Sequence, residues 1–214
     1  MIKAVIFDLD GTLLNTIDDL ANSVNFMLEQ LGFPTFSVDE YKYKVGNGMR
    51  KLIERALPEN NKTQEQIEKS LEIFMEHYNE HKNDNTAPYE DIIPLLKELK
   101  RKGIKLAVAT NKAHIAAKPL IENTFSGLFD EIAGQKENVP TKPNPQIVFE
   151  LLENLSVTPD ECLFVGDSGV DMQTAKNANI TAIGVLWGFR KKEELLQDGA
   201  DEIISSPLEL LKFI

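Results

Sequence analysis

Four short segments of the chain are apolar over nearly all of their length instead of alternating with polar residues. They cover residues 2–8, 105–110, 162–166 and 181–186. Strands that are buried on both faces have this pattern, which is typical of a parallel sheet covered by helices. We therefore expect these segments to be strands of one parallel sheet.

Helical patterns lie between these segments, at residues 91–102, 113–123, 145–155 and 169–178. Thr158 and Ser206 are each followed by Pro, with Glu three residues on, which is typical of the start of a helix. Strands that alternate with helices form right-handed βαβ units. The sequence thus predicts an α/β fold with a doubly wound, Rossmann-like parallel sheet.

Residues 17–83 break this alternation, because they show helical periodicity and no convincing strand. The segment 83–88 that follows is rich in Asn and ends in Pro, as linkers often do. We expect an α/β core domain of residues 1–16 plus 84–214 and an inserted all-α domain of residues 17–83. The apolar positions of its helices are Leu20, Val24, Met27, Leu28 and Leu31 on one face, and Leu52, Ile53, Ala56 and Leu57 on another.

The net charge narrows the classes of partner. The chain of 214 residues has 23 Lys and Arg against 34 Asp and Glu, a formal net charge of -11. This balance argues against nucleic acid or an anionic membrane as a partner. No apolar run reaches the ~18 residues of a membrane span, and the N-terminus lacks the pattern of a signal peptide. We expect a cytoplasmic protein, either a monomer or a homodimer, with the single Cys162 buried as a strand residue.

Two carboxylates, Asp8 and Asp10, end the first apolar segment and are followed by Gly11. Side chains two residues apart on a strand project to the same side, so the pair would meet if the extended form continues to Asp10. In open α/β sheets, ligands bind at the carboxyl ends of the strands. The chemistry of the protein is therefore expected at this edge.

Other polar residues follow the later strands to the same edge. Three or four carboxylates would meet there. Mg²⁺, a hard cation that binds carboxylate oxygens, is the natural ion to balance their negative charge. A hydroxyl, an amide and a lysine beside that metal would surround an oxyanion. The set suits phosphoryl transfer, in which a carboxylate attacks phosphorus and a neighbouring carboxyl moves the proton. These residues are Thr110, Asn111, Lys112, Lys142, Gly166, Asp167 and Asp171.

Four motifs resemble, in order and spacing, those of the haloacid dehalogenase-like superfamily. They are "DLDGT" at 8–12, "TN" at 110–111, "KP" at 142–143 and "GDSGVD" at 166–171. The helical insert resembles the cap of the subgroup with an α-helical cap between the first two motifs. Further segments are similar to phosphoglycolate phosphatases and close relatives: "VGNGMRKLIERAL" at 45–57, "PYEDI" at 88–92, "TNK" at 110–112 and "GVLWGF" at 184–189. The resemblance covers essentially the whole chain.

The resemblance implies a role for each motif residue. Asp8 would be the nucleophile and Asp10 the general acid/base. Lys142 would steady both the transferred phosphoryl group and the charge of Asp8. The implied phosphoryl-binding residues are Thr110 and Asn111. The implied Mg²⁺ ligands are the side chains of Asp8 and Asp167 and the backbone carbonyl of Asp10, with Asp171 as an outer or alternative ligand. In the cap, Asn47, Gly48 and Arg50 would face the leaving group.

The main hypothesis is a Mg²⁺-dependent phosphatase of a small phosphorylated metabolite, with 2-phosphoglycolate as the first substrate to test. Hydrolysis of pyrophosphate or of a sugar phosphate is the alternative within the superfamily, and Mn²⁺ in place of Mg²⁺ stays open. A module whose aspartate is phosphorylated in signalling, like a response-regulator receiver domain, fits less well. Such domains are shorter and lack the helical insert.

Overall fold

A six-stranded parallel sheet forms the larger of two compact units in the computed structural model, which describes residues 1–214. The strand order is β5-β4-β1-β6-β7-β8, and every neighbouring pair is parallel. This confirms the predicted doubly wound α/β fold. The strands are β1 (Ala4–Phe7), β4 (Lys105–Ala113), β5 (Glu131–Gln135), β6 (Cys162–Gly166), β7 (Thr181–Val185) and β8 (Glu202–Ile204).

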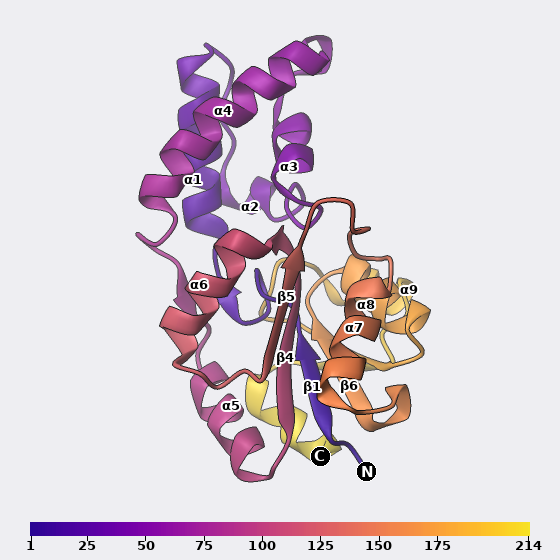
Figure 1. The fold of residues 1–214 in the computed structure, drawn as a ribbon. Coiled ribbons are helices and arrows are strands. Elements are labelled where there is room, and N and C mark those ends of the chain that lie inside the picture. Colours follow the sequence, from indigo (N-terminus) through magenta and orange to yellow (C-terminus); the bar gives the residue numbers. More distant parts are fainter. The chain divides into compact units, whose positions relative to one another are not determined.

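Helices cover both faces of this sheet (Figure 1). One apolar layer contains Val5 and Phe7 of β1, with helices α5 (Ile92–Arg101) and α6 (His114–Phe125). The opposite layer contains Ala4 and Ile6, with α7 (Gln146–Leu155), α8 (Gly169–Asn177) and α9 (Lys192–Gln197). Successive side chains of β1 thus enter opposite layers, which is why the predicted strands are apolar over nearly all of their length.

The sheet contains two strands that the sequence pattern did not predict, β5 and β8. They are the two edges of the sheet, and several of their residues are only partly buried. A strand at an edge does not need a continuous apolar run, so periodicity gives a weak signal there. The two predicted helix starts are also refined. Capping boxes form at Thr158 and Ser206, but they begin 3-10 helices (Pro159–Glu161 and Pro207–Phe213).

The second compact unit is helical and spans Asn15–Ala87. The predicted helical segment, residues 17–83, lies inside these bounds. Apolar residues fill its interior as expected from periodicity, although Leu31 at the end of the first helix is only partly buried. Two short strands that pair with each other, β2 (Leu14–Asn15) and β3 (Ala87–Pro88), lie where the chain enters and leaves this helical unit. The helices are α1 (Ile17–Gln30), α2 (Val38–Tyr41), α3 (Met49–Ala56), the 3-10 helix Glu59–Asn61 and α4 (Gln64–His81).

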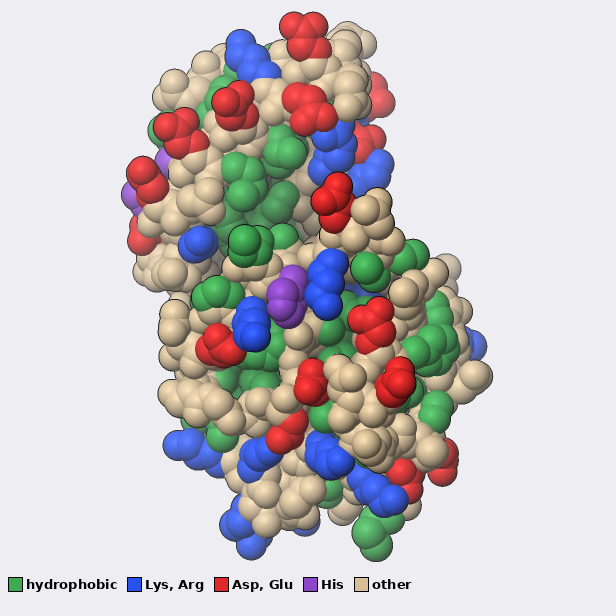
Figure 2. Space-filling model, viewed as in Figure 1, with side chains coloured by type: hydrophobic (Ala, Val, Ile, Leu, Met, Phe, Trp, Pro, Cys, Tyr) green, Lys and Arg blue, Asp and Glu red, His purple; other side chains and the backbone are tan.

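Acidic and basic side chains are interspersed on the face of the molecule shown in Figure 2. None of the helices combines the length and the apolar character that crossing a bilayer demands. Only a few charged side chains are buried. Apart from Asp19 they are Asp8, Lys112, Lys142, Asp167 and Asp171, which all belong to the sheet-containing unit.

Asp19 ties the return segment of the helical unit to the first turn of α1. Its carboxylate accepts hydrogen bonds from the backbone N–H groups of Asn85, at 2.9 and 3.1 Å, and of Thr86, at 2.9 Å. The side chains of Asn85 and Thr86 donate to it at 2.8 and 2.7 Å. Hydrogen bonds to an ionised group are among the stronger ones, so this buried carboxylate fixes the residues just before the chain leaves the unit.

We expect Asp19→Ala to lower the stability of the protein by about 2 kcal/mol, because it removes the buried charged acceptor of all the hydrogen bonds that Asn85 and Thr86 donate to it. Hydrogen exchange should show faster exchange of the Asn85 and Thr86 amides, and the thermal midpoint should fall. Asp18→Ala is the control, because it removes the same charge from the neighbouring, partly exposed position. Equal effects of the two substitutions would contradict the assignment.

Candidate functional site

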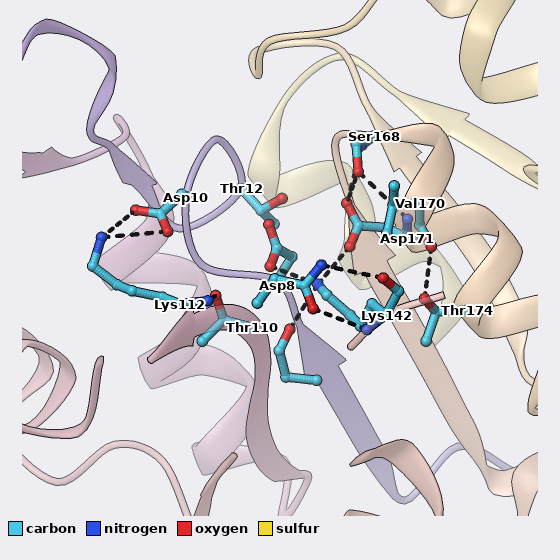
Figure 3. Close-up of polar contacts among 12 residues, drawn as sticks. Asp8, Asp10, Thr12, Thr110, Lys112, Lys142, Ser168, Val170, Asp171 and Thr174 are labelled. Atoms are coloured by element: carbon cyan, nitrogen blue, oxygen red, sulfur yellow. Dashed lines mark hydrogen bonds and ion pairs between the residues drawn. The ribbon is translucent and has the colours of Figure 1, made fainter. Parts of the chain in front are cut away.

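The buried charged residues of the sheet-containing unit gather where β1, β4 and β6 end (Figure 3). Asp8 directly follows β1, and its N–H donates to the carbonyl of Val165 at 2.9 Å. Asp167 directly follows β6, and Asp171 lies in the first turn of α8. In the sheet, β1 lies between β4 and β6. The connection after β1 leads to β4 on one side, and the connection after β6 leads to β7 on the other, and a ligand crevice forms at such a point.

Lys142 is the central cation of this cluster. Its Nζ donates to Asp8 Oδ1 and to Asp171 Oδ1, both at 2.7 Å, and to the carbonyl of Ala109 at 2.8 Å. All three ammonium protons are thereby used. Burial alone would lower the pKa of Lys142, but the charges of Asp171 and Asp8 outweigh burial and raise it. The lysine therefore stays charged.

Three carboxylates, those of Asp8, Asp167 and Asp171, each place an oxygen within 4.8 Å of the others. Burial raises the pKa of Asp8 well above its usual value; Lys142 opposes this rise, and Asp171 and Asp167 add to it. Burial, followed by the charge of Asp171, raises the pKa of Asp167 to about 7. The cluster holds more negative charge than Lys142 neutralises. Its oxygen donors fit a hard divalent cation.

Asp171 also anchors the start of α8. Its Oδ2 accepts from the hydroxyl of Ser168 at 2.6 Å and from the Ser168 N–H at 3.1 Å, so it is the acidic half of a capping box. Gly166 leaves the space for it, because a Cβ at that position would lie 2.3 Å from Asp171 Cβ. With Lys142 on one oxygen and Ser168 on the other, Asp171 is fixed by the protein itself.

Two segments hold Asp167, the turn after β1 and residues 187–189. The hydroxyl of Thr12 donates to Asp167 Oδ1 at 3.3 Å, and the backbone N–H of Phe189 donates to Oδ2 at 2.8 Å. The indole N–H of Trp187 donates to the carbonyl of Thr12 at 3.0 Å. The segment 187–189 thus braces both the turn after β1 and the carboxylate after β6.

Two glycines make this close packing possible. At Gly188, a Cβ would lie 2.3 Å from Asp167 Cβ and 2.4 Å from the carbonyl oxygen of Gly11. Gly11 has a φ of +95°, and a Cβ there would lie 2.4 Å from Asp167 Oδ2. The glycine after Asp10 therefore serves two purposes: it allows the positive φ of the turn, and it leaves room for the carboxylate of Asp167. Sequence reasoning missed the contribution of Gly188 and Phe189, because a backbone donor leaves no side-chain signal.

Thr110 and Asn111 lie at the end of β4, beside the cluster. The hydroxyl of Thr110 accepts from the N–H of Lys112 at 3.1 Å. The amide of Asn111 accepts from the N–H of Lys142 at 2.9 Å and donates to the carbonyl of Lys142 at 3.3 Å. Asn111 thus holds the backbone of Lys142, a contact that the sequence did not predict. Its expected binding of a phosphoryl group stays a prediction.

Asp10 lies outside the strand. β1 ends at Phe7, and the chain turns through residues 9–14, where the N–H groups of Leu13 and Leu14 both donate to the carbonyl of Leu9 at 3.0 Å. The extended form therefore does not reach Asp10, and the condition for a same-side pair is not met. The carboxylate of Asp10 is paired with Lys112 Nζ, at 3.1 and 3.5 Å (Figure 3).

The predicted residues of the insert lie in the helical unit. Gly48 precedes α3 with a φ of +82°. Arg50 donates to Glu68 at 2.8 Å and to Gln64 at 3.0 Å, and Asn47 accepts from Arg55 at 2.6 Å. These contacts all lie within the unit, and the expected contact of Asn47, Gly48 and Arg50 with a leaving group stays a prediction.

Comparison with known proteins finds similarity over both units. The family model of haloacid dehalogenase-like hydrolases matches residues 5–185. The phosphoglycolate phosphatase of Aquifex aeolicus is 33% identical over 213 residues, covering 99% of this chain and 96% of that protein. A solved structure from Lactobacillus delbrueckii subsp. bulgaricus has a TM-score of 0.94 at 34% identity, covering 99% and 98%. That of a predicted phosphoglycolate phosphatase from Haemophilus somnus has 0.91 at 30%, covering 99% and 97%.

The buried charge of Asp167 predicts a pH-dependent effect of Asp167→Asn on the metal-free protein. A folded-state pKa of about 7, above the unfolded value of about 3.9, makes the ionised group destabilising. This penalty is absent below about pH 4, grows as the pH rises and is complete above about pH 7. Asn keeps an acceptor for Phe189 and removes the charge. At pH 8 with a chelator, the thermal midpoint of the variant should exceed that of the unmodified protein by about 3 °C or more.

At pH 4 this gain should vanish. Asp201→Asn is the matched control, since Asp201 is exposed and also accepts one backbone N–H, that of Ala182 at 2.8 Å. A gain at pH 8 that equals the gain at pH 4 would mean that the charge of Asp167 is not the cause.

Proposed function

The chain belongs to the haloacid dehalogenase-like hydrolases, and we propose from this premise that it is a Mg²⁺-dependent phosphatase that acts on 2-phosphoglycolate. It is a phosphoric monoester hydrolase, close to the phosphoglycolate phosphatases. One observation supports the reaction most directly. Asp8 stands at the carboxyl end of the central strand, bound to the ammonium of Lys142 at 2.7 Å, within a cluster of three carboxylates.

In the proposed reaction, Asp8 is the nucleophile. Lys142 occupies Oδ1 of Asp8, which leaves Oδ2 to attack the phosphorus atom of the substrate. A new bond forms between Oδ2 and phosphorus, and the bond from phosphorus to the leaving oxygen breaks. Asp10 gives a proton to that oxygen, so the product leaves as an alcohol and an aspartyl-phosphate remains.

The second half of the reaction returns the enzyme. Asp10, now ionised, takes a proton from a water molecule, whose oxygen attacks phosphorus and displaces Asp8. Phosphate leaves, and the carboxylate of Asp8 is restored. The hydroxyl of Thr110 is a donor for the phosphoryl oxygens, and the positive charge of Lys142 stabilises the negative charge that transfer concentrates there.

The carboxylates of Asp8 and Asp167 and the backbone carbonyl of Asp10 would hold Mg²⁺, with Asp171 as an outer ligand. The ion would supply positive charge beside the phosphoryl oxygens. Its fit follows from the donor set: the oxygens are hard donors, and burial together with mutual repulsion raises the pKa of Asp8 and of Asp167. Mg²⁺ would remove this penalty.

The helical unit would act as the cap that excludes water and selects the leaving group. Asn47, Gly48 and Arg50 are the proposed contacts to that group. The guanidinium of Arg50 is held by Glu68 and Gln64. It suits a small anionic substrate such as 2-phosphoglycolate, because a guanidinium binds carboxylates in two-pronged geometry.

We expect Asp8→Asn to lower kcat for phosphate release by about 10³-fold or more, because the amide keeps the contact with Lys142 but cannot form the phosphoenzyme. Phosphate release in the presence of Mg²⁺ measures this, with acid quenching to trap the aspartyl-phosphate of the unmodified protein. Asp160→Asn, an exposed change of the same kind, should retain full activity. An active Asp8→Asn protein would remove the nucleophile assignment, and a stable phosphoprotein without turnover would favour a signalling module.

Among phosphorylated metabolites, kcat/KM should be highest for 2-phosphoglycolate and about tenfold lower or more for pyrophosphate and for sugar phosphates. Arg50→Ala should raise KM for 2-phosphoglycolate, whereas Arg101→Ala, which removes an exposed guanidinium paired with Glu98, should not. Preference for pyrophosphate or a sugar phosphate would leave the phosphatase class intact and overturn the choice of substrate.

A further inference from the structure

Lys112 and Lys142 are the buried lysines of the protein, and each holds one carboxylate of the first motif. Lys142 binds Asp8, as described above. Lys112 Nζ lies 3.1 Å from Asp10 Oδ1, and its side chain is 2% exposed, whereas that of Asp10 is 22% exposed. The ammonium group therefore approaches Asp10 from inside the protein, and the carboxylate reaches outward from it.

Lys112 lies at an irregularity in β4. The pairing of β4 with β5 shifts register between Thr110 and Ala113, which is the behaviour of a β-bulge. A bulge re-aims the side chains around it and is frequent next to active sites. Burying an ammonium group without a partner is costly. The buried ammonium of Lys112 therefore favours conformations in which the carboxylate of Asp10 stays beside it.

The two carboxylates are paired with different lysines. In Figure 3 the carboxylate of Asp8 faces Lys142, and that of Asp10 faces Lys112. In-line phosphoryl transfer places the leaving oxygen on the side of phosphorus opposite to the nucleophile. A proton donor for that oxygen must therefore stand apart from Asp8, with room for a phosphoryl group between them.

We propose that Lys112 is a positioning residue for proton transfer, which holds the carboxyl group of Asp10 apart from Asp8 and facing the leaving oxygen. The inference rests on the proposed function, in which Asp8 attacks and Asp10 gives the proton. As the bond from phosphorus to the leaving oxygen breaks, its electron pair takes the proton of Asp10. The carboxylate that remains is then paired with the ammonium of Lys112.

Two substrates of similar size test this step. The leaving group of p-nitrophenyl phosphate is a stabilised phenolate that needs no proton, whereas that of p-nitrobenzyl phosphate is an alkoxide that does. Lys112→Met should lower kcat/KM about 100-fold or more for the benzyl substrate and less than about fivefold for the phenyl substrate. Lys112→Arg, which keeps the charge, should restore part of the loss. Lys118→Met, an exposed lysine of α6, is the matched control.

Asp10→Asn should show the same selective loss, and adding Lys112→Met to it should lower the benzyl reaction no further, because the two residues act as one unit. Circular dichroism and the thermal midpoint verify folding of each variant. Equal losses on both substrates, or additive losses in the double variant, would overturn the proposal. A loss confined to KM for 2-phosphoglycolate would overturn it as well, in favour of substrate binding by Lys112.

The proposed function is judged separately in the same assay. If the unmodified protein turns over both substrates and Asp8→Asn does not, the nucleophile assignment stands whatever Lys112→Met does. If Asp8→Asn remains active, the proposed function fails, and a leaving-group-selective loss in Lys112→Met would still locate the proton donor beside Lys112.

Discussion

The ammonium group of Lys142 is what allows three carboxylates to share the carboxyl edge of the sheet. It bonds directly to Asp8 and Asp171, and Asn111 fixes its backbone from the end of β4. Ion pairs that are buried in this way repay their desolvation only when every donor is satisfied, and Lys142 meets that condition with a third bond to a carbonyl. One ammonium group does not neutralise three carboxylates, and this charge imbalance determines the other properties of the site. The raised pKa values of Asp8 and Asp167 express the remaining repulsion, and a divalent cation would relieve it.

Packing of the backbone gives the site its rigidity. Asp167 is enclosed by the turn after β1 and by the segment 187–189, and neither Gly11 nor Gly188 has room for a Cβ. A shift of either segment would therefore move the carboxylate. Such close approach suits a metal ligand, whose oxygens have to keep a defined position. The same packing explains why Trp187, distant in sequence, donates to the carbonyl of Thr12.

Most of the fold could be predicted, because the inner strands β1, β4, β6 and β7 are buried on both faces. Their sequences are therefore nearly continuous apolar runs, which identify them as strands. The edges β5 and β8 could not, since partly exposed strands carry mixed residues. The sequence also placed Asp8, Asp167, Asp171 and Lys142 at one edge, and the structure brings them together. Contacts that depend on backbone detail were beyond reach: the N–H of Phe189, the grip of Asn111 on Lys142, and the pairing of Lys112 with Asp10.

That last pairing resolves the question raised by two carboxylates one residue apart. Had β1 continued to Asp10, both charges would have needed the same cation. Instead the strand ends at Phe7, and the turn that follows places Asp10 next to Lys112 of β4. The four acidic residues Asp8, Asp10, Asp167 and Asp171 then face the two lysines Lys112 and Lys142, so four negative and two positive charges leave a formal excess of two. One divalent cation would balance that formal excess before a substrate arrives, and the proposed binding of the phosphoryl group would then depend on donors such as the hydroxyl of Thr110.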